Sequence, residues 1–167
     1  MASGDVKLVY AAAADVTITL ASLATSSTLL TGRESTAVDN TTTLATDYLV
    51  SGKITTGTSP TTAKSIQVWA VASWDGTTYP DVFDGTDSAE TTTAEMKNIV
   101  CRLVASIATI ATSDLTYHFA GVSIARIFGT VPPKFVFFVT HDTAVNLNST
   151  AGNHQIRVQP VYENVAP

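Results

Sequence analysis

Short stretches rich in β-branched and aromatic residues recur along the chain, with turn residues between them. Such stretches, in which apolar and polar positions partly alternate, are typical of β-strands. They predict strands at residues 6–10, 16–20, 34–38, 48–55 and 65–73. In the last of these, Ile66 and Val68 share one face while Trp69 and Val71 share the other. Both faces are apolar, so this strand is predicted to lie inside a sheet.

Residues 96–110 allow two interpretations. Met96, Ile99 and Leu103 have the spacing of an apolar helix face, whereas Cys101 and Leu103 begin the alternating face of a strand. We favour the strand, and a helix remains the alternative.

The next segments are less ambiguous. Residues 123–128 predict one short helical turn, ended by Gly129 and blocked from continuing by two prolines. Residues 134–140 form a continuous apolar run, which is typical of a strand covered on both sides. In that run, Phe137 and Phe138 point to opposite sides. Since a sandwich strand needs only one inward face, the side of Phe138 must be covered by a loop, by the helical turn or by another subunit.

The end of the chain predicts a closing hairpin, made of residues 145–147, a turn at 148–153 and residues 155–159. The whole pattern predicts an all-β fold, an antiparallel β-sandwich or jelly roll with one short helical turn. A length of 167 residues suits a single domain spanning 1–167, whose N-terminal residues could form an extended arm.

Composition supports this picture and narrows the function. Thr accounts for 28 of the 167 residues, and its β-branched side chain favours sheet. Charged residues make up only 14%, so much of the surface is expected to be buried in an assembly, although a Thr-rich monomer is the alternative. The net charge is −5 and the basic residues are scattered singly, which argues against nucleic acid as a partner.

The sequence shows no sign of export or of enzyme chemistry. It has no signal peptide or membrane-length apolar run, and its single cysteine, Cys101, is expected to be buried. We therefore expect synthesis in the cytoplasm and no membrane partner. No nucleophile elbow or phosphate loop is present, and His118, His141 and His154 lack metal-ligand spacing. We expect no enzyme activity, no cofactor and no metal site.

Two polar features keep weaker alternatives open. The acids of one long loop could attract calcium, but a solvated acidic loop is the favoured interpretation. These acids are Asp75, Asp81, Asp84, Asp87 and Glu90. Separately, exposed aromatic rings could stack on sugars, as in a carbohydrate-binding module. The candidate rings are Trp69, Trp74 and Tyr79.

A series of short motifs resembles a family of small virion structural proteins of tailed bacteriophages. The most specific is the Gly-Arg-Glu-Ser-Thr block that begins at Gly32, and the similarity spans most of the chain. The motifs are Ala21-Ser22-Leu23-Ala24, residues 32–42, Asp47-Tyr48-Leu49-Val50, Val68-Trp69-Ala70, Ser73-Trp74-Asp75-Gly76, Phe128-Gly129, Pro132-Pro133-Lys134-Phe135 and Gly152-Asn153-His154.

The resemblance implies a virion component without enzymatic activity. By analogy with small jelly-roll proteins of phage capsids, the first expectation is a capsid decoration or cement subunit. A tail or collar component is the alternative. The expected partners are copies of the chain itself, with a trimer favoured, together with the major capsid protein or other virion proteins.

The distinctive block also supplies interface candidates. Arg33 and Glu34 are adjacent in a strand-like stretch, so they point to opposite faces and do not pair with each other. Asp39 or Asp47 could accept a bidentate bond from Arg33, within the subunit or across an interface. Asp39 and Asn40 are expected to close a turn. The candidate interface residues are Arg33, Glu34, Asp39, Asp47 and Phe138.

Overall fold

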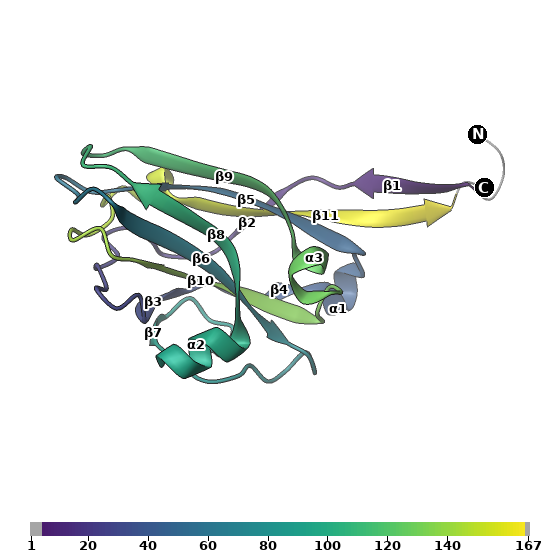
Figure 1. Cartoon of the computed structure of the whole chain (residues 1–167). Helices are drawn as coiled ribbons and strands as arrows, with labels where there is room; N and C mark the ends of the chain where they lie inside the picture. The colour runs from purple at the N-terminus through teal and green to yellow at the C-terminus, as the bar shows by residue number, and fades with distance from the viewer. Residues whose placement is uncertain (1–4, 166–167) are drawn as a thin grey trace.

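The computed structural model describes residues 5–165 as two antiparallel β-sheets packed face to face (Figure 1). This arrangement confirms the predicted all-β sandwich. The first sheet contains β1 (Val6–Tyr10), β2 (Ala14–Val16), β5 (Asp47–Thr55), β9 (Thr116–Ser123) and β11 (Gln155–Val165). The second contains β3 (Thr31–Glu34), β4 (Val38–Asp39), β6 (Lys64–Ser73), β7 (Ala89–Thr91), β8 (Cys101–Thr109) and β10 (Lys134–His141).

Three short α-helices and one 3-10 turn connect the strands. They are α1 (Asn40–Thr43), α2 (Ala94–Val100), α3 (Ile124–Phe128) and η1 (Ala151–Asn153). The strand order is β1-β11-β5-β9 in the first sheet, with β2 also on β11. The second sheet has the order β7-β3-β10-β6-β8, with β4 also on β10. As predicted from its two apolar faces, β6 lies inside its sheet.

The main core lies between the two sheets. Val50 and Ile156 from the first sheet pack in the same cluster as Val68, Phe135 and Phe137 from the second, and all five are fully buried. Two ring pairs of this core, Tyr48–Phe135 and Phe135–Phe137, meet edge to face with ring centroids 5.4 and 5.7 Å apart. Edge-to-face contact places the positive edge of one ring on the negative face of the other.

A second core covers the outer side of β10. Val136 and Phe138 point away from the main core and pack with Val71, Phe83 and Cys101. Phe83 belongs to the long polar loop at residues 74–88, which therefore supplies the cover for this side of the strand. The expectation that Phe138 contacts another subunit is wrong, because its side chain is fully buried within its own subunit. The burial of Cys101 is confirmed, and it raises the pKa of the thiol to about 12.

Residues 96–110 are partly helix and partly strand. The first part is the end of α2, and a strand begins at Cys101. The preference for strand throughout is therefore wrong for residues 96–100. The helix starts where the Thr93 side chain accepts a hydrogen bond from the backbone N–H of Met96, a capping contact that satisfies an otherwise free donor.

The predicted helical turn after β9 is confirmed as α3. The Ser123 side chain accepts a hydrogen bond from the N–H of Arg126 at 3.0 Å, and Gly129 ends the helix with a φ of 84°. Positive φ costs glycine little, which explains why the helix stops there. Asp47 adds a second cap, since its Oδ1 accepts a hydrogen bond from the N–H of Ala125 at 2.9 Å.

Three strand predictions were wrong in part. Of residues 16–20 only Val16 is in a strand, and residues 35–37 interrupt the strand predicted at 34–38. The closing hairpin does not form, because β11 pairs with β1, β2 and β5 instead. Leu147 makes only an isolated bridge with Thr56. These errors share one cause: the partners are distant in sequence, so local pattern does not specify them.

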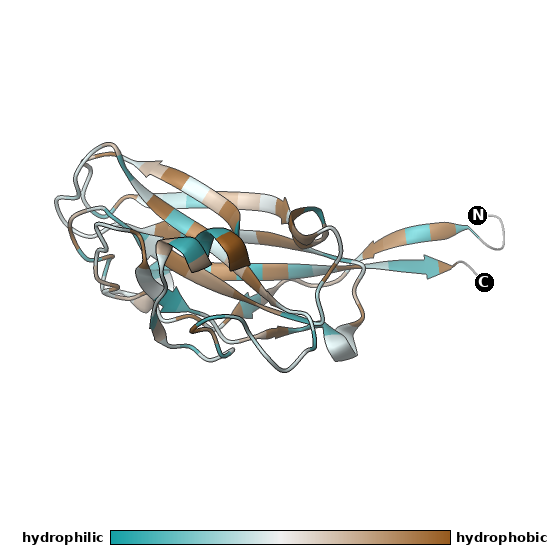
Figure 2. Cartoon of the chain, turned by 60° about the horizontal axis from the view of Figure 1, so that its bottom comes forward, coloured by the Kyte–Doolittle hydropathy of each residue, from teal (hydrophilic) through white to brown (hydrophobic). Residues whose placement is uncertain are grey.

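A two-stranded ribbon extends from the sandwich body. It consists of β1 and the final residues of β11, which pair in antiparallel register from Val6 with Val165 to Tyr10 with Val161 (Figure 1). We call β1 together with residues 162–165 the arm. Figure 2 shows that β1 is largely hydrophobic although it projects into solvent. No helix among the described residues has the length and apolar character needed to cross a membrane.

Candidate functional site

The arm exposes apolar side chains on both of its faces. Every residue of β1 is solvent-exposed, and within residues 5–165 it pairs with β11 alone. A two-stranded ribbon is only marginally stable by itself in water. An exposed apolar ribbon of this kind is typical of a segment that contacts another molecule.

One face of the arm combines apolar residues with a single carboxylate. Residues paired directly across two antiparallel strands project to the same side, so Leu8 lies beside Glu163 and Val6 lies beside Val165. Tyr10 completes this side. The exposed fractions are 63% for Val6, 58% for Leu8, 56% for Tyr10 and 61% for Val165. We call Val6, Leu8, Tyr10, Glu163 and Val165 the arm face.

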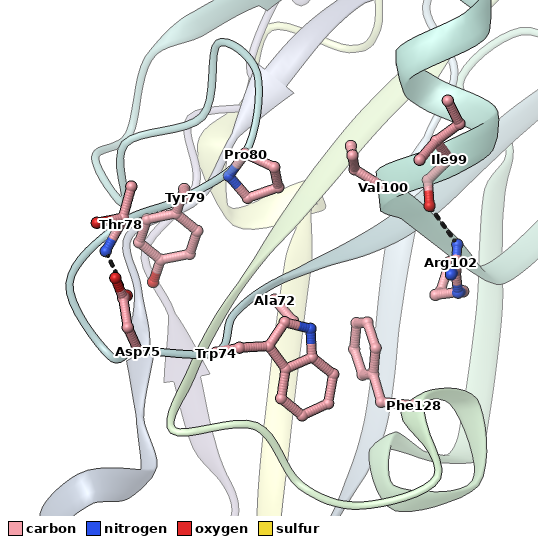
Figure 3. Close-up of a pocket in the computed structure, with 10 residues that line it drawn as sticks. All are labelled: Ala72, Trp74, Asp75, Thr78, Tyr79, Pro80, Ile99, Val100, Arg102 and Phe128. Carbon is pink, nitrogen blue, oxygen red and sulfur yellow. Dashed lines mark hydrogen bonds between the residues drawn. The ribbon is translucent and has the colours of Figure 1, made fainter.

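A pocket of about 550 Å³ lies where β6 ends, between α3 and the junction of α2 with β8 (Figure 3). Its walls come from four places: the end of β6, the loop after it, the junction of α2 with β8, and the end of α3. The lining residues are Ala72, Trp74, Asp75, Thr78, Tyr79, Pro80, Ile99, Val100, Arg102 and Phe128. We call this concavity the aromatic pocket, because the rings of Trp74, Tyr79 and Phe128 line it.

Local contacts position the aromatic rings. Trp74 and Phe128 meet edge to face with ring centroids 6.0 Å apart, which joins the end of β6 to α3. Trp74 nevertheless stays 56% exposed. Asp75 shapes the loop by accepting hydrogen bonds from the N–H groups of Thr77 and Thr78 at 2.8 and 2.7 Å. These bonds hold the pKa of Asp75 well below its usual value, so the turn carries a fixed negative charge.

The pocket also contains two polar groups with spare hydrogen-bonding capacity. Burial raises the pKa of Tyr79 to about 12, and its hydroxyl has no hydrogen-bond partner among the described residues. Arg102 donates from one terminal nitrogen to the carbonyls of Ile99 and Cys101, at 2.8 and 3.1 Å. The other guanidinium donors of Arg102 face no carboxylate within the described chain. The pocket therefore combines three aromatic rings with the Arg102 cation on one wall and the Asp75 carboxylate, bound to its own turn, on another.

The structure assigns Arg33 a different partner from those expected. Its Nε donates to Oδ1 of Asp87 at 2.5 Å, and its terminal nitrogen donates to the Asp87 carbonyl at 2.7 Å. Within the subunit, Arg33 therefore binds neither Asp39 nor Asp47. Asp87 comes from the loop that covers the second core, so the ion pair fixes the end of that loop against β3.

Glu34 is buried and serves as an internal acceptor. Its side chain is fully buried, and its carboxylate accepts hydrogen bonds from the N–H groups of Asp84 and Gly85. Burial outweighs these bonds and raises the pKa of Glu34 to about 7. Glu34 is therefore not available to another subunit, and its candidacy as an interface residue is wrong. As expected, it points to the opposite face from Arg33.

The two remaining acidic candidates are also used within the subunit. Asp39 caps α1 by accepting from the N–H of Thr41 at 2.8 Å, and it lies 3.3 Å from Lys134. This confirms the expected turn at Asp39 and Asn40. Asp47 caps α3. Both side chains stay partly exposed, but the polar contacts described here lie within the subunit.

The histidines and loop acids do not form a metal site in the described part of the chain. Residues 5–165 contain no group of three or more His, Cys, Asp and Glu side chains that could hold an ion. His141 is buried between Leu23 and Thr143, and His154 is buried near Asn148. The loop acids bind separate partners, as in the bond that Asp81 accepts from Thr92.

Sequence reasoning identified two of the three aromatic rings that line the pocket. Trp74 and Tyr79 line it, whereas Trp69 lies elsewhere, with the Lys97 ammonium 4.6 Å from its ring. Ile99, Arg102 and Phe128 were missed because their approach depends on how α2, β8 and α3 fold together. The arm had a detectable signal: apart from Lys7, residues 6–10 all carry apolar or aromatic side chains, with none of the polar alternation of a half-buried strand.

Comparison with known proteins does not assign the chain to a family. No family model, no curated protein and no solved structure matches the chain.

Proposed function

We propose that this chain is a non-enzymatic structural subunit of a tailed-bacteriophage particle, acting as a capsid decoration or cement protein. The observation that carries the proposal is the arm, an exposed apolar ribbon attached to a well-packed sandwich. A subunit that works by packing against neighbours needs such a contact element and needs no catalytic cluster. The low content of charged residues fits a surface that is largely covered in an assembly.

The motif that resembles virion proteins has a structural use in this fold. Gly32 lies so close to β10 that an added Cβ would sit 2.2 Å from the Val139 carbonyl oxygen. Arg33 and Glu34 both hold the C-terminal part of the covering loop, at Asp87 and at Gly85. The Ser35 hydroxyl accepts a hydrogen bond from the N–H of Phe137 at 2.9 Å. The block thus binds the covering loop and β10 together, which supports a role in subunit architecture.

Immunogold labelling of purified particles tests the proposal. Label distributed over the head is the expected result. Label confined to the tail or collar would replace the capsid assignment with the alternative tail role. Absence of the protein from washed particles would overturn the virion proposal altogether.

A carbohydrate-binding module is the second candidate, because Trp74 is exposed at the rim of the aromatic pocket. Aromatic faces stack on sugar rings, and nearby polar groups supply orientation. A glycan array probed with the full chain and with Trp74→Ala separates the candidates. Glycan binding that disappears in Trp74→Ala would favour the module, while no binding by either chain would exclude it for the glycans tested.

A further inference from the structure

The arm face and the aromatic pocket lie on one chain but do not meet within it. The ribbon runs away from the sandwich body beyond α3, and no arm residue lines the pocket (Figure 1). Each subunit therefore exposes two separate apolar surfaces, one convex and one concave. Exposed apolar clusters of this kind mark interaction sites.

The two surfaces match in character. The pocket volume of about 550 Å³ is within the usual range for sites that enclose a ligand. Leu8 and Tyr10 are large side chains that project from an extended backbone. Trp74 and Phe128 offer ring faces and edges at the pocket, where a further aromatic ring can pack edge to face (Figure 3).

The charges match as well. The arm face has one charged group, Glu163, which lies directly across from Leu8. The pocket wall has one cation, Arg102, which the carbonyls of Ile99 and Cys101 hold in place. Its one carboxylate, Asp75, is already bound by the N–H groups of Thr77 and Thr78. Neither Glu163 nor Arg102 takes part in an ion pair within residues 5–165. A guanidinium binds a carboxylate through two parallel N–H donors, and this bond strengthens when apolar surroundings exclude water.

We propose that the arm of one copy docks in the aromatic pocket of a second copy, with Glu163 paired to Arg102. This inference rests on the structural role proposed above and names its partner. Because the two contacting surfaces differ, each copy can place its arm in the pocket of a neighbour and accept an arm in its own pocket. In a reciprocal pair or a closed ring, every pocket holds an arm. In an open chain of copies, one pocket and one arm stay unoccupied at the ends.

Charge reversal in sedimentation velocity experiments on the full chain tests this contact. The unaltered protein is expected to sediment as a multiple of its 17.5 kDa subunit. Arg102→Glu and Glu163→Arg should each weaken association by at least about tenfold, since like charges then meet at the contact. The double variant carrying both changes should recover association, because each arm again meets the opposite charge.

Lys7→Glu is the matched control. Lys7 is also charged and lies on β1, but it pairs across the ribbon with Asn164 and so projects to the side opposite the arm face. This variant should associate as the unaltered chain does. Circular dichroism melts should show that every variant keeps the folded body, since all three residues are exposed.

Three results would overturn the inference: a monomer at the highest soluble concentration, single variants that associate normally, or a double variant that is not rescued. These failures are distinct from failure of the virion proposal. If labelling finds the protein in particles but charge reversal has no effect, the structural role stands and the contact is wrong. If the protein is missing from particles but the double variant restores association, the contact stands and the virion role is wrong.

Discussion

At the scale of single residues, the buried acid Glu34 is the least expected feature. Sequence reasoning correctly separated it from Arg33 by strand alternation. It did not find their partners, because Asp84, Gly85 and Asp87 lie about fifty residues further along the chain. Alternation is a local property, whereas the choice of partner depends on the path of a long loop.

Glu34→Gln should change the pH dependence of stability. The pKa of Glu34 is about 7 in the fold against an ordinary value of 4.5, so the unfolded chain releases this proton at lower pH. Its contribution to stability is therefore full below about pH 4.5 and is lost as the pH rises through about 7. Glutamine keeps an acceptor for the loop N–H groups but does not titrate.

Urea unfolding of both proteins between pH 4 and pH 8 measures this effect. The unfolding free energy of the unaltered chain minus that of Glu34→Gln should decrease across this range. Ser149→Ala, an exposed change that removes no titrating group, is the control and should give a flat difference. If the unfolding free energies of the unaltered chain and Glu34→Gln changed in parallel with pH, the raised pKa of Glu34 would be contradicted.

Phe138→Ala tests whether the outer side of β10 is internal to the subunit. The side chain is fully buried and its ring meets that of Phe83, so its removal leaves a cavity under the covering loop. We expect a loss of about 3–5 kcal/mol in the free energy of unfolding. Leu44→Ala, at a position that is 72% exposed, should cost close to nothing. A cost below about 1 kcal/mol at Phe138 would mean that this side is not a packed core.

At the scale of elements, agreement with sequence reasoning depends on the strength of the local signal. β5, β6, α3 and β10 were predicted nearly to the residue, because long apolar runs and clear caps define them. The α2–β8 junction was predicted as one element, although the sequence there contains both the helical and the strand spacing of apolar residues. A helix can change to a strand within one residue when the cap at Thr93 starts the helix and pairing with β6 holds the residues after Val100 in a sheet.

Ser123→Ala should weaken the start of α3. The Ser123 side chain accepts the hydrogen bond from Arg126, and loss of such a cap costs about 1 kcal/mol of stability. Asp47 continues to accept from Ala125, so the helix should persist. Chemical denaturation measures the cost, with exposed Ser149→Ala as the control. If both serine variants are equally stable, the cap contributes nothing.

At the scale of the whole molecule, the sandwich was predictable and the surfaces were not. Alternating strands specify two packed sheets because each strand must bury one face. The aromatic pocket depends on side chains from four separate segments, and of its three rings only Trp74 and Tyr79 were candidates from the sequence. The arm depends on pairing between segments far apart in the chain, and β1 alone does not indicate β11 as its neighbour.

The arm should be the least protected sheet element of an unassembled subunit. Neither face of β1 is buried, whereas β6 and β10 are covered on both sides. Local opening exposes backbone amides at a free-energy cost set by local packing, so amide hydrogens of β1 should exchange fastest and those of β10 slowest. Hydrogen exchange measured by mass spectrometry on Arg102→Glu, which we expect to remain monomeric, reports this state directly. In the unaltered protein, docking of the arm into a second copy should slow exchange in β1 while that in β10 stays unchanged. Equal exchange in β1 and β10 of Arg102→Glu would show that the arm is already covered within the single subunit.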